Sequence, residues 1–214
     1  RTFFQPRAIQ LSGMATYNFR EAIVTHFAEP GGFALLGSYL IGTWMFKLMP
    51  ASYYSLEGGV QWQHVLSQLV VTDIVQTLAH YAEHKVNATF YKYSHKPHHR
   101  FINPRWADAY NGSCADTIFM ILIPLVICAN SVHCNVWSYM AFGTLYSSYL
   151  TMIHSEFSHF FDPLFRTLGI GTAGDHHVHH RTFVWNYGHI FTYWDRLLGT
   201  YKSPYDVKVF SKEM

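Results

Sequence analysis

The chain has 214 residues, of which 50% are hydrophobic, 18% are aromatic and only 13% are charged. A soluble domain carries about 25% charged residues, so this composition is poor in the groups that cover a water-exposed surface. The formal net charge of +2, without a dense basic block, gives no sign of a nucleic-acid partner. Histidine is the unusual residue, because its count of 15 exceeds the 13 of Asp and Glu together.

Four apolar stretches approach the length of membrane-spanning helices, which need about 17–25 residues; they cover residues 33–50, 62–81, 117–132 and 136–153. If all four stretches cross a membrane, most Lys and Arg residues lie on the same side of it. Three of them precede the first stretch, five lie between the second and third, and six follow the fourth. Only Lys47 falls on the other side. Because basic flanks stay on one side of a membrane, we predict an all-α integral membrane protein with about four transmembrane helices. The alternative is a set of buried core helices in a soluble protein.

The second apolar stretch also carries polar residues at helical spacing, namely Asp73, Gln76, His80, Glu83 and His84. This spacing places them on one face of a helix. Ionisable groups at membrane depth normally face a protein interior and mark a functional site. We therefore expect this face to point toward such a site.

Three histidine clusters, HYAEH, HKPHH and HHVHH, lie on the basic side of the predicted membrane; their spaced histidines are His80, His84, His95, His98, His99, His176, His179 and His180. Positions i, i+3 and i+4 share one face of a helix, so each cluster can present imidazoles to a metal ion. His154, at the end of the fourth apolar stretch, is a further candidate. Eight or nine imidazoles exceed one tetrahedral site, so the sequence predicts two metal ions. Loose metal binding by His-rich loops is the alternative, and imidazole suits Fe, Zn, Cu and Ni alike.

The remaining histidines fall into two sets. His26, His64 and His133 stand apart from the clusters, and we interpret them as structural. The other three lie near the clusters and either bind metal or orient a ligand; they are His159, His177 and His189.

The order HxxxH, HxxHH, HxxHH resembles the pattern of the fatty acid hydroxylase/sterol desaturase superfamily. Residues 175–201, DHHVHHRTFVWNYGHIFTYWDRLLGTY, are most similar to the C-terminal motif of C-5 sterol desaturase-like members, including NYG at 186–188 and WDRLLGT at 194–200. The resemblance covers roughly residues 60–202. It divides the chain into an N-terminal segment 1–32, a membrane domain 33–202 and a C-terminal tail 203–214, which we expect to be an irregular surface extension.

The resemblance implies four membrane helices with a His-rich cap on the basic, cytosol- or matrix-like side. It implies two iron ions, with zinc able to replace them in a purified sample, and O2 as co-substrate. A lipid C–H bond, sterol or fatty acyl, would be hydroxylated or desaturated with electrons from a separate donor such as cytochrome b5. It places the protein in the endoplasmic reticulum, with an organellar inner membrane as the alternative. The implied metal ligands are His80, His84, His95, His98, His99, His154, His176, His179 and His180.

Two acids accompany the histidines. Asp73 lies seven residues before His80 on the same face, and we predict that it accepts a hydrogen bond from the free ring N–H of a ligand. Asp175 stands where many family members have a histidine. It can bind metal, accept from a ligand's ring, or mark a weakened site.

Other functions stay open at this point. The same scaffold supports carotenoid hydroxylation, ether-lipid cleavage and aldehyde decarbonylation. A non-catalytic member can also serve as a structural subunit of a larger membrane complex, and the short chain, Asp175 and the start at Arg1 favour that alternative. Hydroxylation and desaturation use the same ligands, so the sequence does not choose between them.

Overall fold

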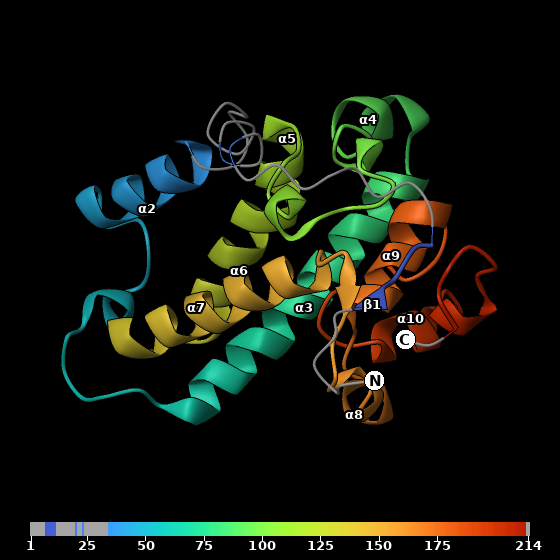
Figure 1. The fold of residues 1–214 in the computed structure, drawn as a ribbon. Coiled ribbons are helices and arrows are strands. Elements are labelled where there is room, and N and C mark those ends of the chain that lie inside the picture. Colours follow the sequence, from blue (N-terminus) through green and yellow to red (C-terminus); the bar gives the residue numbers. More distant parts are fainter. Residues whose placement is uncertain (1–6, 12–19, 21–22, 24–33, 213–214) are drawn as a thin grey trace.

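The computed structural model describes residues 7–11, 20, 23 and 34–212 of the chain. Its centre is a bundle of long helices in which α3 packs against both α6 and α7 (Figure 1). The bundle elements are α2 (Leu35–Met45), α3 (Trp62–Lys85), α5 (Cys114–Thr117), the π-helical stretch η5 (Ile118–Leu122), α6 (Ile123–Ser131) and α7 (Val136–Ile153).

Shorter elements connect the helices of the bundle, and α4 and α9 lie at the C-terminal end of α3 (Figure 1). The helices are α4 (Ala88–Tyr93), α8 (Asp162–Thr167), α9 (Ala173–Thr182) and α10 (Tyr193–Leu198). The 3₁₀ turns are η2 (Ala51–Tyr54), η3 (His98–Arg100), η4 (Trp106–Asp108) and η6 (Pro204–Asp206). Two short antiparallel strands, β1 (Arg7–Ala8) and β2 (Phe157–Ser158), complete the described elements.

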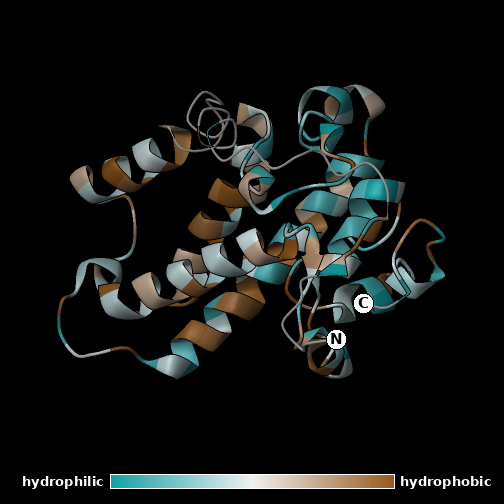
Figure 2. Ribbon diagram, viewed as in Figure 1, coloured by the Kyte–Doolittle hydropathy of each residue, from teal (hydrophilic) through white to brown (hydrophobic). Residues whose placement is uncertain are grey.

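The bundle exposes large apolar side chains on its outer surface and buries polar side chains of α3 beside its apolar core. Large hydrophobic side chains project outward, such as Ile41 and Met140 at 63% and 58% exposure, whereas Gln68 and Asp73 are fully buried. Figure 2 shows hydrophobic residues along α2 and α6, and hydrophilic residues over α9 and the end of α3. Large exposed apolar surfaces of this kind mark contact with a membrane or a partner.

Among the described residues, one helix is both long and apolar enough to cross a membrane, Cys114–Ser131. Helix α2 is apolar but shorter than the predicted stretch 33–50. It ends at Met45 because Lys47 adopts a left-handed conformation (φ 51°) and Leu48 N–H turns back to the carbonyl of Thr43.

Gln76 joins the three long helices of the bundle. Pro124 has no N–H, so it leaves the carbonyl of Met120 without its helical partner, and the preceding turn is π-helical. Gln76 Nε2 on α3 donates to that carbonyl at 2.9 Å. The hydroxyl of Tyr146 on α7 donates to Gln76 Oε1. The polar face predicted on this helix therefore points into the bundle, and one of its members fixes the packing.

The C-terminal tail packs against α9, so the expectation of an irregular surface extension is wrong. Phe210 and Ile9 are fully buried and form a second apolar cluster with Ala173 and Val178 of α9. Ser211 N–H donates to the carbonyl of Ile9 at 2.8 Å. Burial of these apolar side chains holds both described terminal segments onto the helix that carries the HHVHH histidines.

We expect Phe210→Ala to destabilise the folded protein by about 3–5 kcal/mol, because a fully buried phenyl ring is replaced by a cavity. The midpoint of thermal unfolding in detergent, followed by circular dichroism, measures the effect. Phe160→Ala is the matched control, since Phe160 is 73% exposed. Equal midpoints for the two variants would contradict this packing role.

Candidate metal centre

Four parts of the chain supply the nine predicted histidines. The last turns of α3 carry His80 and His84, the turn after α4 carries His95, His98 and His99, and α9 carries three more. His154 is the C-cap residue of α7. The HKPHH segment is not an α-helix: Pro97 is the N-cap of the 3₁₀ turn η3, and that turn points neighbouring histidines in different directions.

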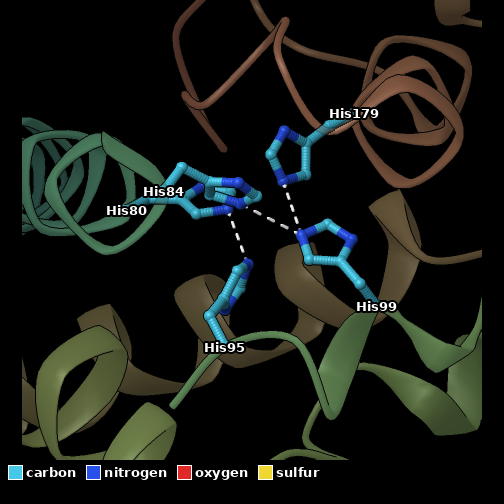
Figure 3. Close-up of side chains that lie close together, drawn as sticks. All are labelled: His80, His84, His95, His99 and His179. Carbon is cyan, nitrogen blue, oxygen red and sulfur yellow. Dashed lines mark hydrogen bonds between the residues drawn. The ribbon is translucent and has the colours of Figure 1, made fainter. Parts of the chain in front are cut away.

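These nine side chains form two groups. In the five-histidine group, ring nitrogens from three separate segments point toward a common centre (Figure 3), and its members are His80, His84, His95, His99 and His179. The four-histidine group consists of His98, His154, His176 and His180. In each group one nitrogen per residue lies within 4.8 Å of all the others.

The two later sequence clusters therefore divide between the groups. On α9, His176 and His180 are four residues apart and lie on the same face. His179 is rotated by about 100° from His180 and enters the five-histidine group instead. Because each of these clusters contributes to both groups, the two groups are held side by side.

Hydrogen bonds to Nδ1 orient most of the rings. Backbone carbonyls of Tyr187, Asn111, Leu150, Trp185 and Phe101 accept from the Nδ1 atoms of His80, His98, His154, His179 and His180 at 2.7–2.9 Å. His95 Nδ1 lies 2.6 Å from a carboxylate oxygen of Asp116. A carbonyl oxygen can only accept, so each carbonyl-bonded Nδ1 carries the proton and the neutral ring presents a bare Nε2 lone pair.

The inward Nε2 atoms approach one another too closely to be stable without a cation. His80 and His95 Nε2 lie 2.8 Å apart, and His98 and His154 Nε2 lie 3.3 Å apart. Two unprotonated nitrogens cannot hydrogen-bond to each other. Ligands of a metal ion bound at about 2.0–2.1 Å have such separations. The arrangement therefore fits one metal ion in each group.

Burial keeps these imidazoles neutral. It lowers the pKa of His95 to about 3. The pKa of His99 is held well below its usual range, first by burial and then by the neighbouring His95 and His179. Neutral imidazole is the form that binds metal. Protonation of one ring would let two facing nitrogens form a hydrogen bond, but the same burial disfavours the charged form.

Asp116 and Glu83 are additional acids at the centre that the sequence analysis did not assign. Asp116 contacts His95 Nδ1 as described, and Glu83 Oε2 lies 3.6 Å from the same atom. Both residues are buried, and neither oxygen of Glu83 has a hydrogen-bond partner. Glu83 belongs to the predicted polar face. The one sequence feature that could have indicated Asp116 is its position directly before an apolar stretch.

Asp73 has no hydrogen bond to a histidine ring in the described part of the chain, so the predicted hydrogen bond to a ligand is wrong. Its carboxylate accepts from the backbone N–H groups of Ile190 and Phe191 at 2.7 and 3.0 Å, and from Trp194 Nε1 at 2.8 Å. These three donors use both oxygens. Asp73 therefore anchors the segment after NYG to α3, because buried N–H groups need an acceptor.

Asp175 also has a structural role. Its carboxylate accepts from the backbone N–H and the hydroxyl of Thr172, which forms an N-terminal capping box for α9. Tyr201 O–H donates to its other oxygen at 3.1 Å. These contacts, at the first turn of α9, replace the expected roles of metal ligand and ring acceptor.

The C-terminal motif supports the five-histidine group through the backbone. Asp195 accepts from the N–H groups of Tyr187 and Gly188, both at 2.8 Å. Asn186 adopts φ 55° and its side chain bonds to backbone groups of Asp175 and Lys202. Together they hold the carbonyl of Tyr187 against His80 Nδ1. The motif thus positions a ring of the five-histidine group without contributing a member to either group.

The other histidines differ in location. His177 points away from both groups, toward Gln10 and the carbonyl of Ser155. His189 lies between the groups, with ring centroids 5.2 Å from His80 and 5.0 Å from His176. His159 lies beside Asp162 and outside both groups.

The three histidines interpreted as structural also stay outside the groups where they are described. His133 is exposed and contacts the carbonyl of Asn130, and His64 is half-buried near the start of α3. His26 lies outside the described residues.

Comparison with known proteins identifies the family. The model of the fatty acid hydroxylase family matches residues 65–200. The chain belongs to the fatty acid hydroxylase family. This confirms the resemblance drawn from the histidine clusters. No solved structure matches the chain.

Curated relatives carry names from sterol metabolism. The chain is 55% identical over 200 residues to an alternative squalene epoxidase of Phaeodactylum tricornutum, covering 93% of this chain and 58% of that protein. It is 29% identical to methylsterol monooxygenase 1 of Danio rerio, over 75% of this chain and 56% of the relative. It is 34% identical to a probable Delta(7)-sterol 5(6)-desaturase of Neurospora crassa, over 58% of this chain and 34% of the relative. The chain thus spans little more than half the length of the first two relatives.

We expect the purified protein to bind about two metal ions per chain. His99→Ala and His176→Ala should each lower this to about one, because each removes a ligand from a different group. Metal analysis of the folded, monodisperse fraction measures the ratio. His177→Gln is the matched control from the same HHVHH cluster and should keep both ions. Loss of metal from His177→Gln alone would contradict the assignment of ligands.

Proposed function

We propose that the protein is a membrane-embedded monooxygenase that uses two iron ions and O2 to oxidise a squalene-type or sterol-type lipid. The observation that carries the proposal is the set of nine imidazoles in two metal-sized groups, of which eight are buried and His84 is half-buried. It occurs in a chain 55% identical to an alternative squalene epoxidase over 93% of its length. The five-histidine and four-histidine groups would each hold one ion.

The proposed reaction adds one oxygen atom of O2 across a carbon–carbon double bond. The π bond of the alkene is lost, two carbon–oxygen bonds form, and the second oxygen atom leaves as water. Two electrons and two protons are required, and a separate protein donor such as cytochrome b5 would supply the electrons. When bound, the iron ions supply the activation of O2. The protein orients the ligands through Nδ1 and buries the centre away from bulk water.

Oxidation of a sterol C–H bond is the second candidate. Relatives named methylsterol monooxygenase and sterol desaturase favour it, at 29% and 34% identity. The same ligand set serves both reactions, so the double bond or C–H bond presented to the centre decides the outcome. A non-catalytic structural role is less well supported, because this chain keeps both complete histidine groups.

The four-span topology and the endoplasmic reticulum location form part of the proposal. The helices α2, α3, α6 and α7 all carry exposed large apolar side chains. Basic residues flank the histidine-bearing end. The histidine groups would lie at the basic face of the membrane, where a soluble electron-transfer domain can approach them.

We expect purified protein with iron, a reducing system and squalene to form squalene epoxide containing one oxygen atom from isotopically labelled O2. Mass spectrometry of the extracted lipid detects the label. His99→Ala should abolish the product, and His133→Ala, at an exposed position outside both groups, should retain it. The proposed epoxidation would be contradicted by an epoxide without the label. It would also be contradicted if a hydroxylated or desaturated sterol were the sole oxidised product.

We expect the two ends of the bundle to lie on opposite sides of the membrane. In a variant without the native cysteines, Ser55→Cys and Ser203→Cys should react with a membrane-impermeant maleimide from opposite sides. Sealed vesicles of known orientation provide the measurement, with detergent-opened vesicles as the control. Labelling of both positions from one side would overturn the four-span topology.

A further inference from the structure

An apolar chamber lies among the helices α2, α6 and α7. Its volume is about 490 Å³, within the range of about 300–1,000 Å³ found for ligand pockets. Side chains from all three helices line it, including Leu40, Trp44, Leu125 and Met140. Leu40, Trp44 and Met140 are also 40–58% exposed. The chamber therefore opens on the apolar surface of the bundle.

The lining of this chamber contains no charged side chain among the described residues. Its polar groups are hydroxyls, and that of Tyr139 is buried without a hydrogen-bond partner. Transfer of an ionised group into such surroundings is strongly unfavourable unless a partner is present. A phosphate-bearing or carboxylate-bearing lipid end would find none here. The chamber therefore fits an uncharged lipid with at most a hydroxyl group.

A second, smaller chamber adjoins both histidine groups. It has a volume of about 40 Å³ and is lined by His95 of the five-histidine group and by His98 and His154 of the four-histidine group. His189, which lies between the groups, also lines it. This space holds a small molecule or the end of a chain, since a water needs about 10–15 Å³.

The two chambers share three lining residues, Leu36, Tyr110 and Ile121. We call these three residues the neck, because they lie between the apolar chamber and the smaller chamber beside the histidine groups. Tyr110 is held in place because its hydroxyl donates to the carbonyl of Ser147 on α7 at 3.2 Å. The neck therefore has one fixed aromatic ring and two aliphatic side chains.

We infer that the apolar chamber receives an elongated, uncharged isoprenoid lipid directly from the bilayer, and that the neck at Tyr110 sets how far it reaches toward the histidine groups. The inference deepens the proposed function and rests on it for the identity of the site. It selects an uncharged isoprenoid over a fatty acyl thioester of coenzyme A, whose phosphates would have no partner in the chamber.

Gly143 provides a direct test of the chamber. It lines the chamber on α7, and a Cβ added there meets no atom within 4 Å. Gly143→Phe should fill the space without disturbing the helix, since any side chain restores helix propensity relative to glycine. Gly42→Phe is the matched control, because Gly42 on α2 also faces open space but does not line the chamber.

The measurement is photolabelling of the metal-loaded protein by a diazirine-bearing squalene analogue, in detergent, without reductant. No turnover is needed, so failure of the proposed oxidation does not affect the result. We expect Gly143→Phe to lower labelling at least tenfold at unchanged metal content and thermal midpoint, and Gly42→Phe to match the wild type. Unlabelled squalene should compete, and palmitoyl-coenzyme A should not. Equal labelling of the two variants, or equal competition by palmitoyl-coenzyme A, would overturn the inference.

The neck is tested with a squalene analogue that carries the diazirine at one chain end. Wild-type protein should be labelled at residues that line the smaller chamber, such as Leu150. Mass spectrometry of peptides identifies the labelled residues. Tyr110→Trp should confine labelling to the apolar chamber, because the larger ring narrows the neck. If residues of the smaller chamber are still labelled in this variant, Tyr110 does not control how far the lipid reaches.

Discussion

The facing Nε2 lone pairs are the constraint on which the rest of the structure depends. Six rings are turned by hydrogen bonds at Nδ1, five to backbone carbonyls and one to Asp116. Each of these bonds fixes a tautomer and points a lone pair inward. A cation in each group would relieve the resulting repulsion. The surrounding helices must therefore hold the acceptors as firmly as they hold the histidines.

Buried carboxylates and an amide supply much of that firmness. Asp73 gathers three N–H donors after the NYG motif, Asp175 caps α9, and Asp195 holds Tyr187 and Gly188. Gln76 joins α3 to η5 through the carbonyl of Met120, which Pro124 leaves free, and to α7 through Tyr146. These polar groups are bonded inside the bundle, whereas large apolar side chains lie on its outer surface. This inside-out pattern suits an enzyme whose substrate dissolves in lipid.

The proposed chemistry follows from how the two chambers meet the histidine groups. An apolar cavity whose described lining residues carry no charge adjoins, at the neck residues, a space bordered by both groups. In the proposed reaction a lipid chain that reached across the neck would keep bulk water out, and exclusion of water limits side reactions. The position of a double bond relative to the neck would then select the bond that is oxidised.

The sequence by itself determined the family, the nine histidines and the polar face of the second apolar stretch, because these depend on residue type and local spacing. Spacing could not assign the histidines to the two groups, because it does not say which face of a turn or helix meets which neighbouring segment: His98 and His99 enter different groups from a 3₁₀ turn. The sequence likewise misled for Asp73 and Asp175, because a carboxylate's partner depends on which N–H groups the tertiary fold brings to it. Five of the Nδ1 acceptors are backbone carbonyls, which every residue possesses. Only the tertiary structure could place them, because a carbonyl carries no signal of its own in the sequence.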